Sequence, residues 1–253
     1  MSGAGRFTAS SATRRAAVAG GRQRDPGAVH RAGPRYTSPW RALAVAAAGF
    51  VLTVIAVMWP PFVAGWTPAA LAAALVVLTM APLAVAVVIA GSGARSRARP
   101  LRGVWRWSWS DLAAGACAGL GLRAAVEILT PTASQASGFV ASTQAVAVTL
   151  VAAVVLAPIV EEAFFRGLVL GAVTDVLSRS IGRTASAVVA ITVSTAAFVA
   201  LHAVAGGLRA DLLLAATLTG IVCGTLAVLT GRIVAPIAAH VVFNGVGAAL
   251  PLI

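Results

Sequence analysis

The sequence predicts an all-α fold: a polytopic transmembrane bundle of about seven helices, with an eighth or re-entrant segment as the alternative. Hydrophobic residues make up 59% of the 253 residues and charged residues only 10%, far outside the composition of a soluble domain. Backbone polar groups in lipid must be satisfied within their own segment, and no apolar run shows the alternation of a barrel strand. The runs are therefore predicted to be helices.

The apolar runs define the domain organisation. A helix needs about 20 residues to cross a bilayer, and seven runs are suitable. They fall near residues 41–59, 69–91, 111–130, 144–177, 184–203, 212–230 and 233–250. We expect a transmembrane domain over residues 39–253, preceded by an Arg-rich tail, residues 1–38, that is predicted to be disordered.

Arginine supplies the whole positive charge, because the chain contains no lysine and carries a net charge of +12. Most arginines lie in residues 1–41 and 95–106, which flank apolar runs. This is the positive-inside pattern, and it predicts a multi-pass protein of the cell membrane with a cytoplasmic N-terminus. It also predicts anionic lipids as partners and argues against nucleic-acid binding.

Polar side chains recur inside the apolar runs of the C-terminal half. The candidate site residues are Glu161, Glu162, Arg166, His202, His240 and Asn244. An ionisable group in hydrocarbon costs several kcal/mol, so it persists where it is paired or faces a wet cavity. The combination of carboxylates, imidazoles and an amide indicates a site that activates water for hydrolysis.

Spacing assigns roles in the fourth run. Glu162 and Arg166 lie i,i+4 with the acid first, which favours an ion pair and leaves Glu161 as a general base. Pro158 removes one backbone donor and is expected to free the carbonyl of Val154. His202 lies as far after the turn near residues 179–183 as Glu161 lies before it. The two side chains are therefore expected at one depth, holding a water between them.

The seventh run carries the other two residues. His240 and Asn244 are spaced i,i+4, so both project from one face and could donate hydrogen bonds to one oxyanion. The depth of His240 is harder to reconcile, since it lies only about 12 to 14 Å along a helix from Arg232. Either the turn before this run is deeply set, with Pro236 starting the helix late, or the expected boundaries are wrong.

Three fragments carry a family resemblance: Glu161-Glu162 with Arg166, Phe198 with His202, and His240 with Asn244. In this order they resemble the motifs of the CPBP family of intramembrane proteases, also called type II CAAX prenyl endopeptidases or the Abi family. The resemblance covers roughly residues 110–250, which we treat as a protease-like core.

The resemblance implies an endopeptidase that cuts peptide or protein substrates in the membrane, prenylated CAAX proteins among them. Glu161 and His202 would activate water, and His240 with Asn244 would support the oxyanion. The family is described as metalloproteases, so a divalent metal such as zinc, bound by Glu161, His202 and His240, is one expectation. A reaction without metal is the other.

Two other functions stay open from the sequence. A proton-coupled transporter would use the same residues as a relay, but it predicts repeated halves with broken helices, and we find no such repeat. A non-catalytic membrane immunity or scaffold protein would keep the fold without cutting. The sequence selects neither a substrate nor an oligomeric state.

Overall fold

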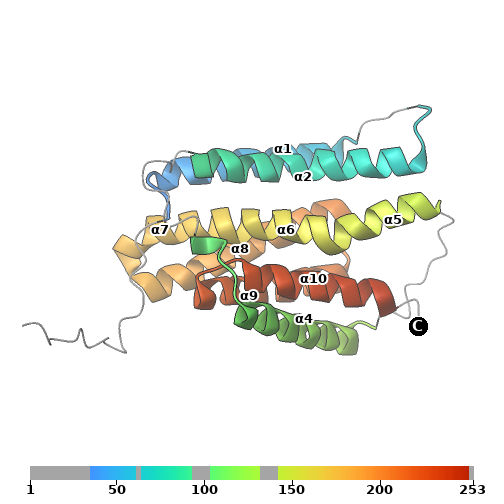
Figure 1. Cartoon of the computed structure of the whole chain (residues 1–253). Helices are drawn as coiled ribbons and strands as arrows, with labels where there is room; N and C mark the ends of the chain where they lie inside the picture. The colour runs from blue at the N-terminus through green and yellow to red at the C-terminus, as the bar shows by residue number, and fades with distance from the viewer. Residues whose placement is uncertain (1–34, 61–63, 93–102, 132–141, 251–253) are drawn as a thin grey trace, which may run out of the picture. The chain divides into compact units, whose positions relative to one another are not determined.

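The computed structural model describes residues 35–60, 64–92, 103–131 and 142–250, and Figure 1 shows them as a set of long helices. These described residues contain no strand, which confirms the all-α prediction. The first three long helices are α1 (Pro39–Met58), α2 (Pro68–Ser92) and α4 (Trp109–Leu129).

One continuous helical run, Thr143–Ile181, carries the Glu pair. It is built from α5 (Thr143–Val151), a π-helical segment η2 (Ala152–Leu156), α6 (Ala157–Glu162), a second π-helical segment η3 (Ala163–Val169) and α7 (Leu170–Ile181). The last three helices are α8 (Arg183–Gly206), α9 (Ala210–Thr230) and α10 (Val234–Ala249).

Six helical runs of the described residues are long and apolar enough to cross a membrane, and α10 is a shorter apolar helix. All seven predicted runs are confirmed as helices, with ends that differ by a few residues, and six of them have the predicted spanning length. The largest difference is in the fourth run, which continues to Ile181. The chain is a multi-pass membrane protein.

Local sequence explains several helix ends. The Ser108 hydroxyl accepts a hydrogen bond from the backbone N–H of Asp111 at 3.2 Å, which caps the start of α4. Gly182 and Gly231 follow α7 and α9 with φ angles of 78° and 67°, which glycine adopts without steric cost. The resulting turns are short, so consecutive helices stay neighbours.

The end of the predicted tail belongs to the bundle. Tyr36 is 7% exposed, and its hydroxyl donates to the Gly167 carbonyl at 3.0 Å. Its backbone N–H donates to Asp175 Oδ2 at 2.8 Å. The prediction of a disordered segment is therefore wrong for residues 35–38, because composition alone overlooks the partners that one aromatic ring finds on the fourth run. Residues 1–34 lie outside the described residues.

The fourth run lies at the centre of the bundle. In Figure 1, α1 and α2 run along one side of it, α10 lies on the other side, and α4 lies beyond α10. Phe164, Phe165 and Leu168 of η3 are completely buried among α1, α2 and α8. The Glu pair immediately before η3 is therefore enclosed on several sides.

Candidate active site

The two adjacent glutamates end α6, between the two π-helical segments. Their side chains are removed from the surface, since Glu161 is 7% exposed and Glu162 is 0% exposed. Consecutive residues of a helix project about 100° apart, so the two carboxylates face different neighbours.

One carboxylate oxygen of Glu162 contacts both a guanidinium and an imidazole. Its Oε1 lies 2.9 Å from Arg166 Nη1 and 3.0 Å from His240 Nδ1. The predicted Glu162–Arg166 ion pair is confirmed. Arg166 is also fully buried, and its guanidinium carbon lies 4.7 Å from the centroid of the Phe198 ring. Charges buried this completely are stable only when paired, so the pair holds this part of the bundle together.

The imidazole of His240 lies between the two carboxylates. Nδ1 is 3.0 Å from Glu162 Oε1, and Nε2 is 3.8 Å from Glu161 Oε2. An ionised carboxylate only accepts hydrogen bonds, so Nδ1 carries the proton of the shorter contact. That bond orients the ring and turns Nε2 toward Glu161, at a distance too long for a direct hydrogen bond.

The imidazole of His202 is positioned by Phe198, one turn earlier on α8. Its Nδ1 donates to the Phe198 carbonyl at 2.9 Å, and the two ring centroids lie 4.2 Å apart. The same Phe198 ring lies 5.7 Å from His240 on another side. Phe198 therefore orients His202 and contacts both histidines.

Asn244 meets the π-helical segment η2. Its Nδ2 donates to the carbonyl of Ala153 at 2.8 Å. At the end of η2, Ala157 N–H bonds to the Ala152 carbonyl, five residues back. With the same five-residue spacing, the backbone N–H of residue 158 would bond to the Ala153 carbonyl. Residue 158 is proline, which has no N–H, so this bond cannot form. Asn244 supplies the missing donor.

One expectation about this region is wrong. The carbonyl freed by Pro158 is that of Ala153 and not that of Val154, because the backbone is π-helical here and the bond partner moves by one residue. The described hydrogen bonds of His240 and Asn244 go to two different acceptors, Glu162 and Ala153. Their joint donation to a substrate oxyanion stays a prediction.

Residues 143–246 match the model of a family described as type II CAAX prenyl endopeptidase Rce1-like. This match supports assigning the region to the type II CAAX protease family. The match contains all three fragments that carried the sequence resemblance, whereas α4, included in the predicted core of residues 110–250, lies outside it. Neither a curated protein nor a solved structure matches the chain.

The depth of His240 in the matched region follows from the turn that precedes α10. Ile233 is 1% exposed, and its N–H donates to the carbonyl of Val104 at 3.0 Å. Arg232 pairs with the buried Asp111 at 3.2 Å. The turn is therefore covered by the segment that leads into α4, and the expectation of a deeply set turn is correct. The expectation that Pro236 starts the helix late is wrong, because α10 begins at Val234.

A metal has no ready set of ligands in this arrangement. Among the described residues, no three side chains of His, Cys, Asp or Glu are placed to bind one ion. The predicted set of Glu161, His202 and His240 does not form such a group. Oε1 of Glu162 already contacts Arg166 and His240, whereas Oε2 is buried without a hydrogen-bond partner. The predicted residues do not form a three-ligand metal site as they are placed, and the need for a metal stays a prediction.

The sequence analysis missed two residues, Ser194 and Tyr36, that donate hydrogen bonds to the backbone of η3. The buried Ser194 hydroxyl donates to the Phe165 carbonyl at 2.8 Å. Ser194, Phe198 and His202 are spaced by four and share one face of α8, so this spacing could have found Ser194. The contact of Tyr36 with Gly167 has no comparable local signal.

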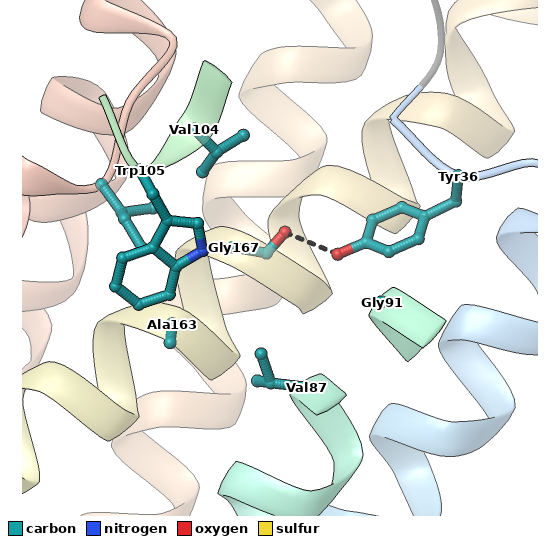
Figure 2. Close-up of a pocket in the computed structure, with 8 residues that line it drawn as sticks. Tyr36, Val87, Gly91, Val104, Trp105, Ala163 and Gly167 are labelled. Atoms are coloured by element: carbon teal, nitrogen blue, oxygen red, sulfur yellow. Dashed lines mark hydrogen bonds between the residues drawn. The ribbon is translucent and has the colours of Figure 1, made fainter. Parts of the chain in front are cut away.

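A pocket of about 170 Å³ lies on another face of η3. Figure 2 shows Ala163 and Gly167 among its lining residues and the Tyr36 hydroxyl pointing toward the Gly167 carbonyl. Its lining residues are Tyr36, Val87, Gly91, Val104, Trp105, Ala163, Gly167 and Ile233. The predicted site residues are not among them, although Ala163 directly follows Glu162.

Proposed function

We propose that this chain is an intramembrane endopeptidase that hydrolyses peptide bonds in membrane-associated peptides or proteins, with prenylated CAAX proteins as the substrate class. The observation that carries the proposal is the placement of His240 between Glu161 and Glu162, inside a region that matches a prenyl endopeptidase family. The proposed catalytic set comprises Glu161, Glu162, Arg166, His202, His240 and Asn244.

Glu161 is the proposed base. A single water within hydrogen-bonding distance of both Glu161 Oε2 and His240 Nε2 fits a separation of 3.8 Å between these atoms. As the water oxygen attacks the peptide carbonyl carbon, Glu161 takes its proton. It then passes that proton to the amine that leaves when the C–N bond breaks.

His202 is the second proposed water-activating group. Its Nδ1–H is committed to the Phe198 carbonyl, so Nε2 of the neutral ring is an acceptor. As an acceptor, Nε2 of His202 can orient or deprotonate a water molecule, so His202 can assist Glu161. It cannot donate a hydrogen bond to an oxyanion in this state.

His240 and Asn244 are proposed to support the oxyanion. The one N–H of a neutral His240 ring is directed at Glu162, so donation from Nε2 requires the imidazolium. The carboxylates of Glu161 and Glu162 and the guanidinium of Arg166 together carry a formal charge of −1. A positively charged His240 ring would balance that charge. The Asn244 amide uses one N–H for Ala153 and has a second for the oxyanion.

The proposed setting is the cell membrane, with the N-terminus in the cytoplasm. Arg35, Arg41, Arg106, Arg183 and Arg232 all lie at or beside the helix ends that this orientation places inside. The same arginines support anionic lipids as partners of this end of the bundle.

The test is cleavage of a farnesylated CAAX peptide library by the purified full chain in detergent. Glu161→Gln and His202→Ala are each compared with a control in the same helical run: Thr149→Ala and Thr192→Ala, whose side chains are exposed. We expect release of C-terminal fragments by wild type and both controls. Loss of the base should lower the rate by about 10²- to 10⁴-fold.

Full activity of Glu161→Gln would refute the mechanism. No cleavage by a folded wild type would refute the prenylated substrate class and favour a binding or proton-relay role. A parallel reaction with chelator, followed by zinc addition, decides whether a metal is required.

A further inference from the structure

Helix α4 lies outside the matched region but packs lengthwise on α10, which carries His240 and Asn244. Gly115 meets the backbone of Ala235, and Gly119 meets the backbone of Ala239. From the first contact to the second, the residue number rises by four on both helices, so α4 and α10 are parallel. One row of residues spaced by four on α4 packs along one such row on α10.

The same row continues at both ends of the interface. Asp111, four residues before Gly115, pairs with Arg232 at 3.2 Å although it is only 3% exposed. The guanidinium carbon of Arg123, four residues after Gly119, lies 5.5 Å from the centroid of the Phe243 ring. A half-buried ion pair and a cation–π contact therefore lie at the two ends of the interface, and the two glycine contacts lie between them.

The contact at Gly119 leaves no room for a side chain. A Cβ there would overlap the Ala239 carbonyl oxygen and would lie 3.0 Å from the Val242 Cβ, whereas ordinary contact begins at 3.4 Å. A backbone carbonyl cannot rotate aside as a flexible side chain does. The added methyl group could therefore be accommodated only if α10 moved away by about 1 Å in a close-packed interior.

We propose that Gly119 is a positioning residue for the active site. Its close approach to the Ala239 carbonyl sets where the next residue, His240, lies relative to Glu161 and Glu162. The catalytic part of this inference rests on the proposed endopeptidase function, and the positional part does not. Helix α4 thereby belongs to the working unit although residues 143–246 alone match the family.

The test compares Gly119→Ala with Gly121→Ala in the full chain. Gly121 is the matched control, because it lies on the same helix and a Cβ there meets nothing within 4 Å. A displacement of about 1 Å at a catalytic group can lower the rate about 10²-fold. We expect that loss in kcat for Gly119→Ala, with KM within about two-fold of wild type, and no change for Gly121→Ala.

A second readout measures position without activity. Val154 Cγ1 lies 3.4 Å from a Cβ built at Gly245, so cysteines at 154 and 245 should form a disulfide across η2 and α10. In a Cys117→Ala background, oxidation of Val154→Cys/Gly245→Cys should be slowed at least several-fold by Gly119→Ala and left unchanged by Gly121→Ala.

Equal kcat and equal cross-linking for the two glycine variants would overturn the inference, as would equal losses in both. If wild type cleaves no peptide, the proposed function fails, and the cross-linking comparison alone decides the position of α10. If Gly119→Ala does not fold, Asp111→Asn replaces it. This variant weakens the same row without adding volume, and unchanged cross-linking there would overturn the inference.

Discussion

Nδ1 of His240 lies 3.0 Å from Oε1 of Glu162, a carboxylate 78 residues earlier in the chain. The same oxygen lies 2.9 Å from Arg166 Nη1. One atom of Glu162 thus joins the first and last polar fragments of the sequence. Glu161, on the neighbouring position, is left facing the other nitrogen of the ring.

Glu162→Gln should destabilise the protein. The substitution leaves the fully buried guanidinium of Arg166 without its counter-charge, and breaking one side of a buried ion pair costs about 3 to 5 kcal/mol. The measurement is the free energy of unfolding in detergent or mixed micelles. A variant as stable as wild type would show that Arg166 finds another anion.

Glu161→Gln should separate activity from stability. The nearest described partner atom of this carboxylate is 3.8 Å away, so the amide should change the free energy of unfolding by about 1 kcal/mol or less. Peptide cleavage should be lost. A decrease in stability as large as that of Glu162→Gln would contradict the division of roles between the two residues.

Asn244→Ala should be partly rescued by Pro158→Ala. The first substitution leaves the Ala153 carbonyl without its side-chain donor, at a cost of about 1 to 2 kcal/mol. The second restores a backbone N–H at the position that the π-helical register assigns to this carbonyl. A double-mutant cycle on the free energy of unfolding should show a coupling of about 1 kcal/mol. Strict additivity would mean that the two residues do not share this carbonyl.

Arg166→Lys should not preserve the site. The guanidinium lies over the Phe198 ring and directs Nη2 toward the carbonyls of Thr219 and Gly220 at 3.5 and 3.4 Å, which one ammonium group cannot reproduce. We expect a loss of about 2 kcal/mol in stability. Arg209→Lys, at an exposed ion pair with Asp211, is the control and should unfold like wild type.

Tyr36 should ionise only at strongly alkaline pH. Burial raises the pKa of its phenol above the usual value of about 10. The neutral phenol is thus favoured in the folded state. The resulting stability is fully present below about pH 10 and is lost as the pH rises through the higher folded-state pKa. Because Tyr36 is the chain's single tyrosine, phenolate absorbance reports this group alone.

The control for that titration is the same measurement on denatured protein, where the phenol should ionise near its usual pKa. Ionisation of the folded protein at the same pH as the denatured chain would mean that Tyr36 is not held against Gly167.

Local features of this protein could be predicted because their causes act within one segment. The length of hydrocarbon to be crossed determines each apolar run by itself, and the i,i+4 spacing of Glu162 and Arg166 is enough to pair them on any helix. The relation of Phe198 to His202 is predictable for the same reason.

Contacts between segments could not be predicted in this way. Nothing near His240 indicates that its turn is covered by Val104, and this cover is what brings the ring down to Glu162. The π-helical register at η2 moved the freed carbonyl from Val154 to Ala153. A shift of one residue in bonding depends on the packing around the helix and not on its composition.

By itself, the sequence determined a seven-helix membrane bundle and the six polar residues worth examining, since periodicity, run length and the cost of burying charge are properties of the chain alone. The tertiary structure decided which of these residues meet. It gave Glu162 two partners, placed Asn244 on a backbone carbonyl and pressed α4 against α10. Those choices depend on packing between distant segments, where a difference of one helical residue or about 1 Å changes the partner.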